Sequence, residues 1–419
     1  MFEQYKLKNK ANVIFVPQKD TRSVTVMVMY PVGSRYESDK MAGVSHYIEH
    51  LMFKGTTKRK TTQILTREID RLGAEYNAFT SKENTGYYIK VDSAYTKIAL
   101  DILSDMLFHS LFDPKEMERE KGPIVEELRM YRDNPMMNID NVFEDLMYAG
   151  CPVGRDIGGT PETVMSFKRN DVLAFKKKYY TASNMTIVVA GNVDETTKKL
   201  VQEFFGEEKN TGVPSHEYLP AVYGPNTKEK RLVIQKKETD QVQLMLGFPG
   251  FQYGAKENPA VTVMNTIFGG SMSSRLFIQI RERRGLAYVV SSGSDKFRDT
   301  GHAYVRMGLE AKNINKALAV VKQEIQKLVT KGVTARELAD AKTHIHGGMA
   351  LSLEDSSTQA SWYAKEALFD TKIKTPEERM SEINAVTRED VQAVAKKIFR
   401  LKEARVAIIG DVKKDIELF

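Results

Sequence analysis

Two histidines and a glutamate stand within one five-residue segment, His46-Tyr47-Ile48-Glu49-His50. The segment is expected to be helical, and residues four positions apart share one face of a helix. His46 and His50 are therefore predicted to bind the same metal ion, with Glu49 beside it. Two neutral imidazoles with a carboxylate nearby favour zinc. The chain of 419 residues contains only seven His, which makes this spacing a specific signal.

A zinc ion held by two His needs a third protein ligand, and a catalytic ion also keeps a position open for water. Segment 113–134, DPKEMEREKGPIVEELRMYRDN, is predicted to be helical and is rich in acidic residues. Most carboxylates on a helix are simply solvated, so the pattern leaves the choice of ligand open. Gly122-Pro123 predicts a kink or a restart of the helix, because proline removes a backbone hydrogen bond. The candidate ligands are Glu116, Glu118, Glu120, Glu126 and Glu127.

Three segments of the first half, HYIEHLMFKGT, NAFTSKENTGYY and EREKGPIVEEL, together resemble the pitrilysin, insulinase and mitochondrial processing peptidase family of zinc metallopeptidases. The order His-x-x-Glu-His is that of the inverzincins. The resemblance implies that Glu127, separated from His50 by 76 residues, is the third ligand. It also implies that Glu120, seven positions before Glu127, lies close to the metal ligands. Pro123 departs from the family pattern.

The same resemblance implies roles for residues outside the metal motif. In the second half, Arg281 and Tyr288 match an Arg/Tyr pair of the family, which would hold the substrate and stabilise negative charge on its carbonyl oxygen. In the first half, Asn77, Ala78 and Phe79 would form an edge strand to which a substrate peptide adds as a further strand. Without the resemblance, these segments predict only a solvated helix end and a hairpin in the core sheet.

The composition excludes several other classes of function. The 62 basic and 55 acidic residues are spread along the chain, and the net charge of +7 has no accompanying nucleic-acid motif. Cys151 is the only cysteine, so no internal disulfide can form, and no His-containing motif frames it as a nucleophile. No segment of about 20 apolar residues predicts a membrane span, and no signal peptide is recognised. We therefore expect a cytoplasmic protein that binds neither nucleic acid nor membranes.

The two halves of the chain resemble each other. VTVMVMYPVGSRYES at 24–38 parallels VQLMLGFPGFQYGAK at 242–256, and the helix-strand pattern of 171–207 returns at 390–419. Strands and helices mix in each copy, which predicts two homologous α+β domains, each with a mostly antiparallel sheet packed with helices. The Pro- and Gly-rich segment between the copies predicts a linker. The expected boundaries are 1–210 for the zinc-binding domain, 211–230 for the linker and 231–419 for the second domain.

These features predict a zinc metalloendopeptidase that binds one zinc ion per chain and hydrolyses short or unfolded peptides. Glu49 is expected to act as the general base toward the metal-bound water. The resemblance further implies a homodimer that encloses a chamber, with Arg281 and Tyr288 completing the active site of the partner chain. Two alternatives remain open, namely a non-catalytic or regulatory subunit of a heterodimeric processing peptidase and a structural zinc protein. The second alternative would need a fourth ligand from Cys or His.

Overall fold

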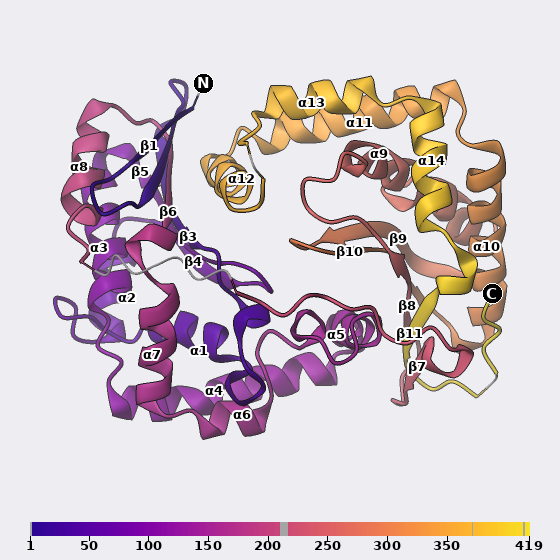
Figure 1. Cartoon of the computed structure of the whole chain (residues 1–419), viewed down its shortest axis with the longest axis horizontal. Helices are drawn as coiled ribbons and strands as arrows, with labels where there is room; N and C mark the ends of the chain where they lie inside the picture. Colours follow the sequence, from indigo (N-terminus) through magenta and orange to yellow (C-terminus); the bar gives the residue numbers. More distant parts are fainter. Residues whose placement is uncertain (1, 210–216, 371, 414) are drawn as a thin grey trace. The chain divides into compact units, whose positions relative to one another are not determined.

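The computed structural model describes residues 2–209, 217–370, 372–413 and 415–419. It divides into two compact units, each built on one mixed sheet with helices on its faces (Figure 1). Residues 210–216 of the predicted linker lie outside the described residues. The first unit contains Met1–Arg129, Arg155–Leu219 and Ser352–Ile373, and the second contains Met130–Gly154, Pro220–Leu351 and Lys374–Phe419.

The sheet of the first unit has the strand order β1-β2-β6-β3-β5-β4. β2 and β6 run parallel, and the other neighbouring strands are antiparallel. Because side chains alternate along a strand, Val24, Val26 and Val28 of β3 enter one apolar cluster while Met27 and Met29 enter another. The strands are β1 (Glu3–Lys6), β2 (Asn12–Pro17), β3 (Ser23–Tyr30), β4 (Glu75–Thr80), β5 (Thr85–Asp92) and β6 (Thr186–Gly191).

Helices bury both faces of this sheet. The face that carries Val24, Val26 and Val28 packs with α1, α3, α7 and α8 in one apolar cluster. The opposite face packs against Ala360 and Ala364 of α12. The helices that begin in this unit are α1 (Val44–Leu51), α2 (Thr62–Asp70), α3 (Thr96–His109), α4 (Pro114–Asp133), α6 (Pro161–Ser166), α7 (Arg169–Tyr179), α8 (Glu195–Phe205) and α12 (Ser356–Phe369).

The second unit repeats this plan with the strand order β7-β11-β8-β10-β9. β7 and β11 run parallel and the other neighbouring strands are antiparallel, so this sheet matches the part β2-β6-β3-β5-β4 of the first sheet. The predicted α+β fold with an internal repeat is confirmed. The strands are β7 (Leu232–Gln235), β8 (Val242–Pro249), β9 (Ala287–Lys296), β10 (Gly301–Leu309) and β11 (Arg405–Ile409); the helices are α5 (Pro135–Met147), α9 (Asn258–Gly269), α10 (Ile314–Lys331), α11 (Ala335–Ser352), α13 (Pro376–Ala385) and α14 (Arg388–Ile398).

Two helices belong to a different unit from the one that their position in the sequence suggests. α5 follows α4 in the first half of the sequence, yet Ile139, Phe143 and Met147 bury its apolar face with residues of β8 and β11. α12 belongs to the second half of the sequence but covers β3 and β6 of the first sheet. The predicted boundaries, 1–210, 211–230 and 231–419, stay a prediction. They divide the sequence into continuous stretches, whereas each compact unit combines segments that are distant in the chain.

α4 runs without interruption through Pro123, so the predicted restart of the helix does not occur. Pro123 lies on the exposed side, where water can bind the carbonyl that loses its hydrogen-bond donor to the proline ring. Ile124 and Leu128 on the other side are buried in the core and keep the helix in place. A continuous helix matters for the site, because it leaves Glu120 and Glu127 on one face.

No helix among the described residues is both long enough and apolar enough to cross a membrane.

Candidate metal centre

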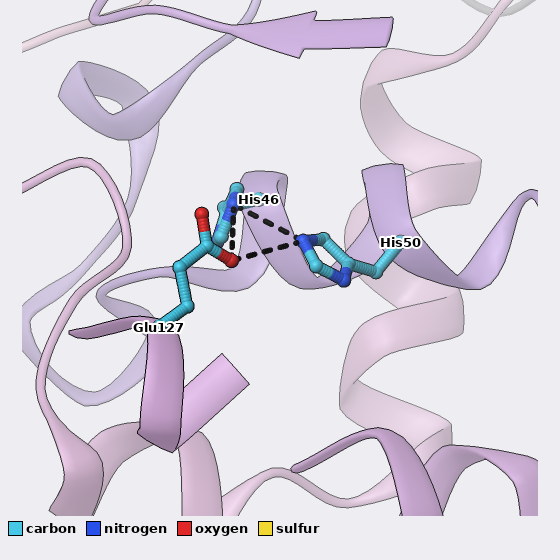
Figure 2. A group of neighbouring side chains, drawn as sticks. All are labelled: His46, His50 and Glu127. Atoms are coloured by element: carbon cyan, nitrogen blue, oxygen red, sulfur yellow. Dashed lines mark hydrogen bonds and ion pairs between the residues drawn. The ribbon is translucent and has the colours of Figure 1, made fainter. Parts of the chain in front are cut away.

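His46, His50 and Glu127 point toward one another (Figure 2). The Nε2 atoms of the two histidines are 3.3 Å apart, and the Glu127 Oε2 atom lies 3.5 Å from His50 Nε2 and 3.8 Å from His46 Nε2. A tetrahedral zinc ion with bonds of about 2.0–2.1 Å keeps its ligand atoms roughly 3.3 Å apart. These three side chains therefore fit zinc, and among the described residues they are the one group of three or more His, Cys, Asp or Glu that could hold a metal ion.

The sequence of α1 explains why the two histidines leave the core. Val44, Tyr47, Ile48 and Leu51 recur at intervals of three and four residues and are fully buried in the apolar cluster of the first unit. His46, Glu49 and His50 occupy the remaining part of the helix surface and are only partly buried. The helix is thus anchored by its apolar face, and its polar face is directed at the candidate centre.

The start of α1 is held by the buried carboxylate of Glu37. Its two oxygens accept hydrogen bonds of 2.7 Å from the backbone N–H groups of Gly43 and Ser45, donors that no earlier helical turn can satisfy. Gly43 has φ 92°, and a Cβ atom on it would lie 2.3 Å from the carbonyl oxygen of Gly158. This position therefore requires glycine, and Glu37 and Gly43 together fix where α1 begins.

α4 delivers the third side chain. The Tyr47 hydroxyl donates a 2.5 Å hydrogen bond to the carbonyl of Met117, which joins α1 directly to α4. Glu127 lies beside the histidines, whereas Glu126 is exposed and pairs with Arg129 at 2.6 Å. The structure therefore separates two neighbouring glutamates that the acidic pattern alone left equivalent.

The charges of the three side chains influence one another. Burial, followed by the charge of neighbouring His50, lowers the pKa of His46 to about 4. Burial also lowers the pKa of His50, but hydrogen bonds with Glu120 and Glu127 outweigh this and raise it to about 9. A hydrogen bond with His50 lowers the pKa of Glu127. These contacts therefore favour a proton on His50, and the ring nitrogen must lose its proton before it can bind a cation.

Glu49 lies outside this group of three but next to it. Thr80 of β4 donates a 2.6 Å hydrogen bond to its Oε2 atom. Burial raises the pKa of Glu49, while the hydrogen bond from Thr80 and the charge of His50 act in the opposite direction. A desolvated carboxylate with one oxygen held and the other available is suited to accept a proton. Sequence analysis missed Thr80, although it directly follows Phe79 in the segment that carried the resemblance.

Comparison with known proteins identifies the family. Residues 13–160 match the description "Insulinase (Peptidase family M16)", and residues 166–345 match "Peptidase M16 inactive domain". A protein of Bacillus subtilis (strain 168), named "Uncharacterized zinc protease YmxG", is 35% identical over 399 residues that cover 95% of this chain and 96% of the relative. The chain belongs to the M16 peptidase family. A second relative, "Uncharacterized zinc protease SCO5738" of Streptomyces coelicolor, is 33% identical over 94% of this chain and 86% of its own length.

Two solved structures have the same fold as this chain. A protease from Helicobacter pylori superposes with a TM-score of 0.92 at 22% identity, covering 98% of this chain and 99% of the other. A structure described as a peptidase M16 inactive domain from Pseudomonas fluorescens gives a TM-score of 0.90 at 19% identity, covering 99% of each chain. The name "inactive domain" agrees with the second repeat of this chain, whose sequence lacks the His-x-x-Glu-His motif.

The residues predicted to bind peptide lie on β4, at the edge of the first sheet. β4 pairs with β5 on one side and is the last strand of the order. Asn77 is exposed, Ala78 is buried and Phe79 is half-buried. Because α1 lies against β4, this edge is next to the candidate centre. The role of these residues in binding a peptide stays a prediction.

Arg281 and Tyr288 contact each other in the second unit. Arg281 belongs to a π-helical segment, Phe277–Glu282, and its guanidinium group lies 4.7 Å from the centre of the Tyr288 ring. Tyr288 is the second residue of the edge strand β9 and is 69% exposed. π-Helical turns recur at functional sites, and this one pairs the two residues that the resemblance singled out. Their catalytic roles stay a prediction.

Replacing Glu127 by Gln is expected to weaken zinc binding by more than the roughly 10–100-fold that loss of an outer partner of a metal ligand costs. The physical reason is that the amide is a neutral and weaker ligand than the carboxylate. Competition with a chromophoric chelator measures the affinity. Glu126→Gln is the matched control and should bind zinc like the wild type. Equal affinities of all three proteins would contradict the assignment of Glu127.

Glu37 is expected to make the metal-free protein less stable as pH rises from about 4.5 to about 7. Burial raises the pKa of Glu37 to about 7, against the effect of the Ser45 and Gly43 N–H groups. The folded state therefore holds a proton that the unfolded state releases, and stability is lost as pH rises through this window.

The loss due to Glu37 amounts to roughly 3 kcal/mol across the whole window. Thermal unfolding of the wild type and of Glu37→Gln between pH 4 and 8 measures it. Because the amide does not ionise, the melting temperature of Glu37→Gln relative to that of the wild type should increase as pH rises. The exposed Glu126→Gln variant serves as the control. Parallel curves for the wild type and Glu37→Gln would refute the prediction.

Proposed function

We propose that this M16 chain is a zinc-dependent endopeptidase that hydrolyses short or unfolded peptides. The observation that carries the proposal is the meeting of His46, His50 and Glu127 within ligand distance, with the Glu49 carboxylate beside them. The names of the zinc protease relatives support the metal. We propose one zinc ion per chain, bound by these three side chains.

The chemistry divides between the metal and the side chains of this protein. When bound, zinc acts as a Lewis acid and lowers the pKa of a coordinated water to about 7. Glu49 accepts the proton of the attacking water on its free oxygen and later donates it to the leaving amine. Thr80 keeps the other oxygen of Glu49 in place. The outer edge of β4 binds the substrate backbone as an added strand, which gives affinity with little dependence on sequence.

The second unit is proposed to act across chains. By resemblance to the family, we propose a homodimer that encloses a chamber, in which Arg281 holds the substrate and Tyr288 stabilises the developing oxyanion at the zinc of the partner chain. Tyr288 is well exposed, as a residue that acts on another chain must be. We also propose a cytoplasmic location, because a chain with Cys151 as its single cysteine is suited to a reducing compartment.

Glu49→Gln is expected to retain zinc and to lose turnover by about 10²–10⁴-fold, the range in which general bases contribute. Purified protein is incubated with a mixed peptide pool, and cleavage is read by mass spectrometry. A chelator should abolish cleavage by the wild type, and added zinc should restore it. Full activity of zinc-loaded Glu49→Gln would exclude the mechanism. Zinc binding without cleavage of any peptide by the wild type would favour a non-catalytic subunit.

Mixing the inactive variants Glu49→Gln and Tyr288→Phe is expected to restore activity. In the mixed dimer, the intact Glu49 of one chain meets the intact Tyr288 of the other, so one of two sites works. Random exchange in a two-fold symmetric dimer would return about a quarter of the wild-type activity. The measurement is peptide cleavage after mixing, with each variant alone as the control. No recovery would indicate sites built within a single chain.

A further inference from the structure

Lys54 lies close to the candidate centre, at a position to which the sequence assigned no role. It lies four residues after His50, in the turn that follows α1, where its backbone N–H donates to the carbonyl of Leu51 at 3.1 Å. Its Nζ atom is 2.6 Å from Oε2 of Glu120, and its side chain is 24% exposed. Lys54 therefore touches a neighbour of the metal ligands without touching the ligands themselves.

Glu120 connects Lys54 to His50. The Oε1 atom of Glu120 lies 2.9 Å from Nδ1 of His50, so each carboxylate oxygen has its own partner. The Glu120 side chain is only 9% exposed, and a buried carboxylate is costly unless it is paired. Burial raises the pKa of Glu120, but hydrogen bonds with His50 and Lys54 outweigh this and leave it below its usual value.

The consequence for His50 is a fixed orientation. A carboxylate can only accept hydrogen bonds, so Nδ1 of His50 must carry the hydrogen and Nε2 must face away from Glu120. Nε2 is the atom that lies 3.3 Å from His46 Nε2 and 3.5 Å from Glu127. Partners of this kind fix the ring and tautomer of a metal-binding His, and losing them typically costs about 10–100-fold in metal affinity.

We propose that Lys54 is a positioning residue that holds Glu120 against His50 and thereby strengthens zinc binding. The inference rests on the zinc site of the proposed function. Without the ammonium group, the buried Glu120 carboxylate loses the partner of its Oε2 atom and turns toward water. The hydrogen bond that orients His50 is then weakened or lost.

The direction of the change in zinc affinity distinguishes positioning by Lys54 from electrostatic repulsion between Lys54 and the metal ion. A lysine near a divalent cation repels it through space. If Lys54 acted only through its charge, its removal would strengthen zinc binding. If Lys54 acts through Glu120, its removal weakens zinc binding.

The experiment measures zinc affinity of the full chain by competition with a chromophoric chelator. Lys54→Met is expected to bind zinc about 10-fold or more weakly than the wild type, and Lys54→Arg, which keeps a cation, should lose less. Lys58→Met is the matched control, because Lys58 lies in the same loop, is 59% exposed and pairs with Asp101 at 2.5 Å instead. Its affinity should equal that of the wild type. Circular dichroism of the metal-free variants verifies that they fold.

A double-mutant cycle identifies the route of the effect. Glu120→Gln alone should weaken zinc binding, and adding Lys54→Met to it should change the affinity little further. Unchanged or stronger zinc binding by Lys54→Met, or full additivity with Glu120→Gln, would overturn the inference while leaving the proposed function intact. A wild-type protein that binds no zinc would instead overturn the proposed function, and the inference with it.

Discussion

The contact between α1 and α4 is the constraint on which the candidate centre depends. Helix geometry alone brings His46 and His50 together. Glu127 belongs to a second helix, so its distance from both histidines depends on how the two helices pack. The buried apolar face of α1 and the hydrogen bond from Tyr47 to Met117 determine that approach. Because zinc tolerates little variation in bond length, the packing of two helices sets the chemistry available to the site.

The three glutamates at and around the candidate centre differ in their surroundings. Glu127 faces the histidines, Glu120 is paired on both oxygens, and Glu49 is desolvated with only one oxygen held. These environments lower the pKa of the first two and raise that of the third. Such a separation supports the proposed roles of Glu127 as a ligand, Glu120 as a positioning group and Glu49 as a base.

The internal repeat shows that scaffold and site are independent. Both sheets use the same strand order, and both are stabilised by alternating apolar residues that contact helices on each face. That packing requires neither His nor Glu at the surface of a helix, so the second copy keeps the fold without the metal motif. Each sheet is also covered by a helix from the other half of the sequence, α12 in the first unit and α5 in the second.

The amino-acid sequence by itself determined the parts of this protein that follow from local periodicity. The spacing of His46 and His50, the alternation in β3 and the duplicated patterns predicted the metal pair and two α+β copies, because neighbours along a helix or strand have fixed relative directions. The family resemblance pointed to Glu127, but only the tertiary structure decided that this side chain lies within ligand distance of both histidines, that α4 continues through Pro123, and that Thr80 contacts Glu49 and Lys54 contacts Glu120. Those facts depend on which faces of distant elements are buried together, and pairwise packing of that kind leaves no periodic trace in the chain.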